Sequence, residues 1–230
     1  MKKYMPMLAT ALLFSAATAN AQLLSISGVA STNVPIGDPL NQNNVLNRPL
    51  TNTSGFENNP PSTQLWYATP TSALSTTQAD VVLDWYFIGS ESGYTNTLKS
   101  GPADAIDYTE QNTIGLFGLG SYTQTTQGNV DMRFTGGDAP VENGITTGGG
   151  FPGITFAYVS GSLATGWTFS AAATDTVIFG LNDNNVGGDD NHDDWMGVVV
   201  ASPVPVPAAL PLFLSALAGL GIFGRRKQAA

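Results

Sequence analysis

Short segments rich in Val, Ile, Phe, Tyr, Trp and Thr recur between residues 23 and 201, separated by clusters of Gly, Asn, Asp and Ser. This spacing is typical of strands in an all-β domain. No 12-residue window there has a convincing helical period, and only residues 102–109 favour a helical turn or two. We therefore expect an all-β fold, an antiparallel β-sandwich with jelly-roll-like connections. The expected strands are residues 23–29, 65–69, 81–89, 113–119, 130–134, 154–159, 167–171, 176–181 and 195–201.

Alternation of residue types predicts which faces of two strands point inward. The uniformly apolar set in residues 81–89 should face the core. That set is Val81, Leu83, Trp85 and Phe87. In residues 130–134, Asp131 and Arg133 are expected to point outward between apolar neighbours that point inward.

Residues 31–63 are rich in Asn and Pro and show neither helical nor strand periodicity. We expect a long loop or a loosely packed arm there. The chain has 26 Gly and 14 Pro among its 230 residues. Their combined fraction, about 17%, is below the roughly 25–30% that indicates disorder. Residues 22–203 are therefore expected to form one folded, loop-rich domain.

Residues 1–21 have the pattern of a secretory signal peptide. Lys2 and Lys3 precede a short apolar segment, and Ala19 and Ala21 provide the small residues of a cleavage site. The apolar segment is too short for a permanent membrane span. We expect export, with a mature chain that begins at Gln22.

A second apolar segment, residues 210–224, contains no charged residue. The uncharged stretch from Val204 onward matches the length of roughly 17–25 residues that crosses a bilayer as a helix. A basic cluster then follows at residues 225–230, which the positive-inside bias places in the cytoplasm. Residues 204–230 thus predict a single transmembrane helix, with everything before Val204 outside.

The tail resembles the VPLPA-type variant of the PEP-CTERM sorting signal of Gram-negative bacteria, with Val206 where that variant usually has Leu. The resemblance covers about a tenth of the chain. It implies recognition and cleavage near residues 204–207 by an exosortase, a membrane cysteine transpeptidase-like enzyme, usually in species that make extracellular polysaccharide. It implies a sorting address and no activity. The residues of the implied signal are Val204, Pro205, Val206, Pro207, Ala208, Ala209, Arg225, Arg226 and Lys227.

Net charge excludes one class of binding partner, and the lack of cysteine excludes one kind of cross-link and one kind of catalytic nucleophile. Only Arg48, Lys99 and Arg133 are basic between residues 22 and 203, against all 17 acidic residues, so this segment carries a net charge of −14. Such a field repels nucleic acid and attracts cations, so we expect no nucleic-acid partner. The chain has no cysteine, which excludes disulfides and thiol nucleophiles.

Residues 88–97 follow the strongest strand signal and contain two glycines suited to a tight reversal. Glu91 and Asn96 could accept or orient a ligand, although a structured turn packed by Tyr94 is the simpler interpretation. The segment also resembles a Gly-x-Glu-x-Gly-Tyr-Thr-Asn element found, together with an acidic stretch before the final strand, in some sorted surface proteins of the same class.

Residues 181–195 hold five carboxylates within twelve residues, between two apolar strands. Like charges packed in a loop are unfavourable unless water or a cation neutralises them. Carboxylate and amide oxygens are ligands that Ca²⁺ prefers, so the loop predicts one Ca²⁺ site; the alternative is a solvated acidic loop. Because no helices flank it, it is not an EF-hand. The candidate ligands are a subset of Asp183, Asn185, Asp189, Asn191, Asp193 and Asp194.

Catalytic machinery is sparse. His192 is the single histidine, and no Gly-x-Ser-x-Gly sequence is present, which argues against a Ser-His-Asp triad and against zinc. We therefore expect no enzyme, but a structural or adhesive protein of the cell surface or extracellular matrix. A carbohydrate-binding module is the near alternative, and a carboxylate glycoside hydrolase the distant one.

The expected partners are an exosortase, the membrane and extracellular polysaccharide. The final expected strand runs almost directly into Val204. A permanent transmembrane helix should therefore hold the acidic loop close to the bilayer surface.

Overall fold

The structure is a computed structural model that describes residues 21–28, 30–31, 66–67, 71–90, 92–110, 114–136, 140–144, 153–164, 166–183 and 194–205, together with Phe213 and Leu217. Between residues 21 and 205 the described residues include no helix, and all strand pairings are antiparallel. The expectation of an all-β domain is confirmed. The strands are β1 (Leu24–Ser27), β2 (Ala30–Ser31), β3 (Trp66–Tyr67), β4 (Ala73–Thr76), β5 (Val81–Gly89), β6 (Asn96–Ser100), β7 (Ile106–Glu110), β8 (Ile114–Gln124), β9 (Gly128–Asn129), β10 (Met132–Thr135), β11 (Val141–Glu142), β12 (Ile154–Ser162), β13 (Gly166–Phe169), β14 (Thr176–Leu181) and β15 (Trp195–Pro203).

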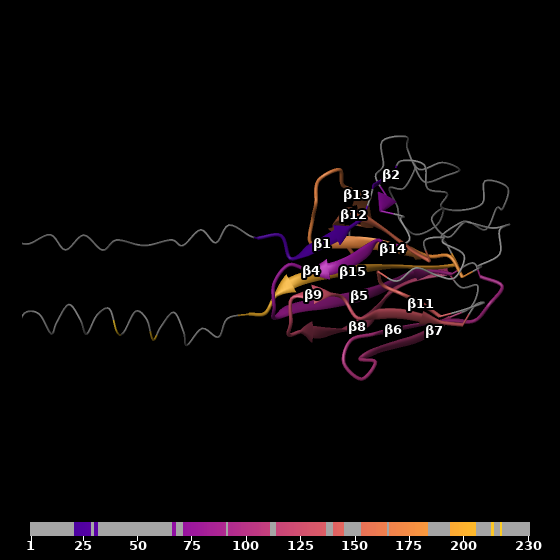
Figure 1. The fold of residues 1–230 in the computed structure, drawn as a ribbon, viewed down its shortest axis with the longest axis horizontal. Helices are drawn as coiled ribbons and strands as arrows, with labels where there is room; N and C mark the ends of the chain where they lie inside the picture. Colours follow the sequence, from indigo (N-terminus) through magenta and orange to yellow (C-terminus); the bar gives the residue numbers. More distant parts are fainter. Residues whose placement is uncertain are drawn as a thin grey trace, which may run out of the picture.

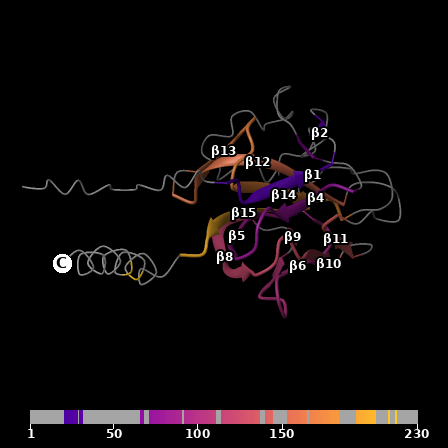
Figure 2. The same ribbon diagram turned by 60° about the vertical axis from the view of Figure 1, so that its left-hand side comes forward.

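These strands form three sheets (Figures 1 and 2). The large sheet has the order β2-β3-β12-β14-β15-β5-β8, and β13 adds to it beside β12. A four-stranded sheet has the order β11-β10-β6-β7, and a three-stranded sheet has the order β1-β4-β9. The last strand of the chain, β15, therefore lies inside the large sheet, between β14 and β5.

Alternation in β5 sets the inner face of the large sheet. Val81, Leu83, Trp85 and Phe87 are at most 1% exposed, as predicted. In β10 and the residues just before it, Asp131 is exposed and Arg133 half-buried, whereas their apolar neighbours are buried, which confirms the second prediction from alternation.

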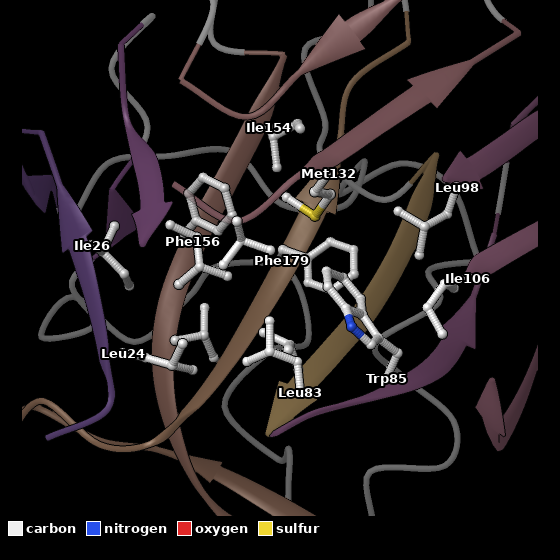
Figure 3. Close-up of a cluster of buried hydrophobic side chains, with 14 of the residues drawn as sticks. Leu24, Ile26, Leu83, Trp85, Leu98, Ile106, Met132, Ile154, Phe156 and Phe179 are labelled. Atoms are coloured by element: carbon white, nitrogen blue, oxygen red, sulfur yellow. The ribbon is translucent and has the colours of Figure 1, made fainter. Parts of the chain in front are cut away.

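All three sheets contribute to one buried cluster of apolar side chains (Figure 3). Phe179 of β14 lies parallel to Trp195 of β15 at 5.7 Å between ring centroids, and Phe134 of the four-stranded sheet meets the same indole edge-on at 5.3 Å. Each fully buried side chain of this size contributes about 1.5–3 kcal/mol relative to its exposed state. This shared core joins the sheets.

A second buried cluster lies on the other face of the large sheet. It contains Trp167 of β13, which packs against Tyr86 of β5 at 5.4 Å between ring centroids. Trp85 and Trp167 are thus core residues.

Residues 102–110 and several short strands differ from expectation. The prediction of a helical turn at residues 102–109 is wrong, because residues 101–105 form a non-helical turn and Ile106–Glu110 is strand β7. Ala103 and Asp104 have φ angles of 54° and 57° in that turn, which a helix excludes. Strands β4 and β6 were not expected from sequence.

Both ends of the folded region meet at one residue. The backbone N–H of Leu23 donates to Asp175 Oδ1 at 2.5 Å, and the N–H of Ala201 donates to the Asp175 carbonyl at 2.8 Å. Figure 1 shows β15 ending at the end of the molecule where β1 begins. The N- and C-terminal strands are therefore tied together there.

The acidic loop begins at the opposite end of the large sheet. Asp194 immediately precedes β15, whereas Val204 follows its last residue. Nine strand residues lie between Asp194 and Val204, which at about 3.3 Å per residue places these two residues roughly 33 Å apart. The base of the acidic loop and the start of the tail are therefore at opposite ends of β15, so the short connection does not by itself bring that base to the bilayer.

Candidate functional site

The chain turns between β5 and β6 through a buried polar segment. Ser90, Ser92 and Asn96 are at most 2% exposed. Ser92 Oγ accepts a hydrogen bond at 2.8 Å from the N–H of Tyr94, which fixes the turn locally. The Tyr94 side chain is 43% exposed.

A second polar segment follows β14. Asn182 continues the sheet beyond the strand, because its N–H donates to the Gly153 carbonyl at 3.0 Å. The N–H of Asp183 then donates to Asp194 Oδ2 at 2.8 Å. Since Leu181 of β14 pairs with Trp195 of β15, this bond closes the base of the acidic loop directly above the last strand pair.

The two segments meet at Asp183. Its Oδ2 accepts hydrogen bonds from Ser92 Oγ and from Asn96 Nδ2, the latter at 2.5 Å. Asp183 is 5% exposed and Asp194 is 8% exposed. A buried carboxylate needs such donors, because removal from water is costly for an ionised group. The structure thus brings together the two stretches that sequence singled out.

No described cation offsets the charge of Asp183. Lys99 and Arg133 both form ion pairs with Asp104 in the four-stranded sheet, with Asp107 and Asp131 as further partners. The third basic residue of the domain, Arg48, lies outside the described residues. Hydrogen bonds, and not ion pairs, therefore hold the described part of this site.

The predicted Ca²⁺ ligands are only partly described. The backbone N–H of Asp183 donates a hydrogen bond to the side-chain carboxylate of Asp194. Within the described ranges, no group of three or more His, Cys, Asp or Glu side chains is arranged to hold a metal ion. The other candidates fall outside those ranges, as does His192. They are Asn185, Asp189, Asn191 and Asp193.

Sequence reasoning identified Asn96 but missed Ser92. The sequence indicates that Asn96 could orient a ligand, whereas in the structure its amide donates to a carboxylate of the same chain. The signal for Ser92 is weak, since a serine between Glu and Gly is ordinary in any turn. Glu91 lies outside the described residues.

The sorting tail is described only at its start. The Val204 N–H donates to the Asp80 carbonyl at 3.4 Å, and Pro205 is the last residue of the continuous region. Phe213 and Leu217 are helical and exposed. The rest of the predicted signal, Val206 to Ala209 with Arg225, Arg226 and Lys227, and residues 1–20 of the predicted signal peptide lie outside the described ranges. In the part of the chain that the structure describes, we find no apolar helix of membrane-spanning length.

Two shallow hollows adjoin each other where the three sheets come together. One, of about 220 Å³, is lined by Asp131, Arg133 and Glu142 among others, and the second, of about 180 Å³, by Tyr122, Gln124 and their neighbours. Asn129 and Asp131 line both. Burial raises the pKa of Tyr122 to about 12, and its ring lies parallel to that of Trp85 at 6.3 Å, so little of this ring is open to a ligand.

No protein family model matches this chain, and no curated protein or solved structure matches it significantly.

Proposed function

We propose that this protein is an exported component of the cell surface or extracellular matrix, delivered by exosortase-dependent sorting and structural or adhesive in role. It is not an enzyme in this proposal. The observation that carries the proposal is the position of β15, which lies inside the large sheet and leads directly into Val204. The strand pairing of the large sheet ends at Pro203, so a cleavable tail can follow without breaking a strand pair.

We propose an antiparallel β-sandwich, jelly-roll-like in its connections, for residues 22–203. The support is the shared core, to which the large sheet contributes Trp85 and Phe179 and the four-stranded sheet contributes Met132 and Phe134. Sheets that bury one apolar face against each other form this architecture.

Mass spectrometry of the mature protein tests the sorting proposal. In cells with an exosortase, the C-terminal peptide should end near residues 204–207; in cells without it, the chain should keep residues 210–230. Pro205→Ala with Pro207→Ala should abolish processing, whereas Ala229→Ser should not. An identical C-terminus in both cell types would contradict the proposal.

The acidic loop is proposed to hold one Ca²⁺ that stabilises the domain. The support is the buried pair of carboxylates at its base, Asp183 and Asp194, in a domain with a net charge of −14. Hard oxygen ligands of this kind suit Ca²⁺. Binding to the folded state alone should raise the melting temperature as Ca²⁺ rises above its dissociation constant.

Calorimetric titration and thermal melting with Ca²⁺ test this site. Millimolar Ca²⁺ should release or absorb heat and raise the melting temperature of the wild type. Asp189→Asn with Asp193→Asn should remove both effects, whereas Asp107→Asn, which removes a carboxylate paired with Lys99 outside the loop, should keep them. No heat and no shift in the wild type would refute the Ca²⁺ proposal and leave the sorting proposal untouched.

Carbohydrate binding is the second candidate. It is favoured by the two adjoining hollows that share Asn129 and Asp131, because amide and carboxylate groups are common partners of sugar hydroxyls. A glycan array with the wild type and Asn129→Ala tests it. Reducing-sugar release from the cells' own polysaccharide, lost in Glu142→Gln, would instead indicate a glycoside hydrolase.

A further inference from the structure

Gln22, the residue at which we expect the mature chain to begin, is built into the fold. Its carbonyl accepts a hydrogen bond from Thr77 Oγ1, and its side-chain amide donates to the Leu24 carbonyl and to the Tyr158 hydroxyl, the latter at 3.3 Å. Gln22 is half-buried, whereas Ala21 is exposed. These contacts fix the position of the backbone nitrogen that becomes the N-terminus after cleavage.

Further contacts hold the residues that follow Gln22. The Thr77 N–H donates to the Leu23 carbonyl at 2.9 Å, and the Tyr158 hydroxyl accepts from the Ile26 N–H at 3.0 Å. Strand β1 then pairs with β4. The start of the domain is therefore anchored to three separate elements, namely β4, β12 and the residues just before β14.

Asp175 lies beside this start and has one carboxylate oxygen to spare. Its Oδ1 accepts from the Leu23 N–H at 2.5 Å, and no described group donates to its Oδ2. Consecutive backbone nitrogens are at most about 3.6 Å apart, so the nitrogen of Gln22 lies within about 6 Å of Asp175 Oδ1. Opposite charges at this distance stabilise each other.

No described basic side chain pairs with Asp175. Lys99 and Arg133 both form ion pairs with Asp104 in the four-stranded sheet. Arg48 lies outside the described residues. Asp175 is therefore a carboxylate that has no cation in the described part of the chain.

The other ionisable groups on the elements that hold Gln22 do not compete with a cation there. They are Tyr158 on β12 and Asp80 in the turn that follows β4. Burial raises the pKa of Tyr158 above its ordinary value of 10.0, so its hydroxyl stays neutral at physiological pH. Asp80 has the same sign of charge as Asp175 and adds to the attraction for a cation.

We propose that Asp175 binds the α-ammonium group that forms at Gln22 when residues 1–21 are removed. The inference rests on the proposed export of the protein. One water molecule hydrolyses the Ala21–Gln22 peptide bond. Its oxygen completes the carboxylate of Ala21, and both of its hydrogens go to the nitrogen of Gln22. A neutral amide thus becomes a cation beside Asp175.

Processing therefore strengthens the connection between the two ends of the domain. Asp175 already holds the first strand through the Leu23 N–H and the last strand through the Ala201 N–H, which donates to its carbonyl at 2.8 Å. The precursor lacks the ammonium at Gln22. The domain thus reaches its full stability only after the signal peptide has been removed.

Two chains that differ by one residue test the ion pair. One begins at Gln22 and the other at Ala21, and both keep the whole C-terminal tail and are studied in a mild non-ionic detergent. In the second chain the ammonium lies one residue further out, on an exposed residue. At about pH 6.5, the unfolding equilibrium constant in urea should be roughly three- to tenfold smaller for the chain that begins at Gln22.

Substitution of Asp175 shows whether this carboxylate is responsible. Asp175→Asn keeps an oxygen that can accept from the Leu23 N–H but removes the charge, so it should abolish the difference between the two chains. Asp107→Asn, which removes a carboxylate paired with Lys99, is the matched control and should preserve the difference.

A pH series gives a second measurement that packing alone would not change. An ammonium whose pKa is raised by a carboxylate contributes stability that is fully present below its unfolded pKa of about 7.7–8.0, and that is lost as pH rises through its folded pKa. The advantage of the chain that begins at Gln22 should therefore shrink from about pH 8 upward. It should not shrink in Asp175→Asn.

Three results would overturn the proposal. They are equal stability of the two chains, a difference that survives in Asp175→Asn, and a difference that is constant with pH. Mass spectrometry of the N-terminal peptide from cells adds a fourth, because a Gln22 that has lost ammonia by cyclisation has no ammonium to bind. A mature chain that begins at another residue would overturn the predicted cleavage and this role of Gln22 together, whereas the stability measurements concern the ion pair alone.

Discussion

The side-chain amide of Asn143 takes the place of backbone pairing between two sheets. Its Oδ1 accepts from the Leu74 N–H at 2.8 Å, and its Nδ2 donates to the carbonyls of Leu74 and Val130 at 2.7 Å each. Leu74 belongs to the three-stranded sheet, and Asn143 itself follows the four-stranded sheet. One buried side chain, 7% exposed, thus satisfies three backbone groups and connects the sheets.

Asn143→Asp should be strongly destabilising, although the two side chains have nearly the same shape. A carboxylate cannot donate to the two carbonyls, and an unsatisfied buried group costs about 1–3 kcal/mol. We expect a loss of about 3 kcal/mol or more in urea unfolding followed by tryptophan fluorescence. Asn129→Asp, at an exposed site where Oδ1 only accepts from Ser75, should stay within about 0.5 kcal/mol of the wild type.

Asp183→Ala tests the contact between the two candidate stretches. It leaves the donors of Ser92 and Asn96 buried without their acceptor, so we expect a loss of about 2–4 kcal/mol. The measurement is urea unfolding in excess chelator, which separates this loss from any effect of Ca²⁺. The control is Asp84→Ala on the half-buried face of β5. Equal effects of the two substitutions would mean that the Asp183 contacts contribute nothing specific.

Strand β10 ends just before Gly136, which lies against the backbone of Thr95 and Asn96. Gly136 has a φ of 113°, and a Cβ placed there would lie 2.0 Å from the Thr95 carbonyl oxygen. Two strands, β10 and β6, can pair up to this point only because residue 136 has no side chain. The turn that presents Asn96 to Asp183 therefore depends on a neighbouring strand.

Gly136→Ala should cost about 3 kcal/mol or more, because the angle is strained and the backbone of β6 must move. Gly93→Ala is the matched control, since a Cβ there meets nothing within 4 Å. We expect it to change stability by less than about 0.5 kcal/mol. Amide hydrogen exchange at Asn96 should rise in the first variant and not in the second.

The turn between β6 and β7 is held by charge. A hydrogen bond from Lys99, with Arg133 nearby, holds the pKa of Asp104 below its ordinary value of 3.8. A carboxyl whose pKa is lowered by folding contributes stability that is present above its unfolded pKa and is lost as pH falls through its folded pKa. Asp104→Asn should therefore be less stable than the wild type at pH 7, and the difference should vanish in strong acid. A constant difference at all pH values in urea unfolding would contradict this.

Sequence predicted strands well where they are buried and poorly where one face meets solvent. The bounds of β5 and β14 match the expected ranges, because both strands are almost continuously apolar. Strand β6, Asn-Thr-Leu-Lys-Ser, has one apolar residue, and its inward Asn96 and Ser100 are recognisable only from their partners. The turn before β7 combines Pro102 with acidic residues, a pattern that also begins helices.

The candidate site was predictable in parts but not as a whole. Both stretches carry a visible signal, glycines in one and carboxylates in the other. The two stretches meet through two contacts, one between residues separated by 87 positions in the sequence and one between residues separated by 91 positions. Their meeting also depends on the strand order that places β5 beside β15. Local patterns contain no information on such distant pairs.

In the whole molecule, the end of β15 that leads into the tail lies at one end of the large sheet. The base of the acidic loop lies at the opposite end. Asp175, which binds Leu23 and Ala201, lies at the start of β14, and Asp183 follows the end of the same strand. If the tail spans the membrane, this arrangement directs Asp183 and Asp194 away from the point of attachment. A protein anchored at one end would then present the proposed Ca²⁺ site outward.

The same arrangement predicts where the chain can be shortened. A chain that ends after Pro205 keeps all of β15, so its urea midpoint should correspond to a stability within about 0.5 kcal/mol of the full chain. A chain that ends after Val198 loses the pairing of residues 199–203 with Val81 to Trp85. Because that pairing lies inside the sheet, the shorter chain should not fold and should be digested rapidly by protease. If removal of the tail alone costs more than about 1 kcal/mol, residues beyond Pro205 belong to the folded domain, and the tail cannot be a separable sorting signal.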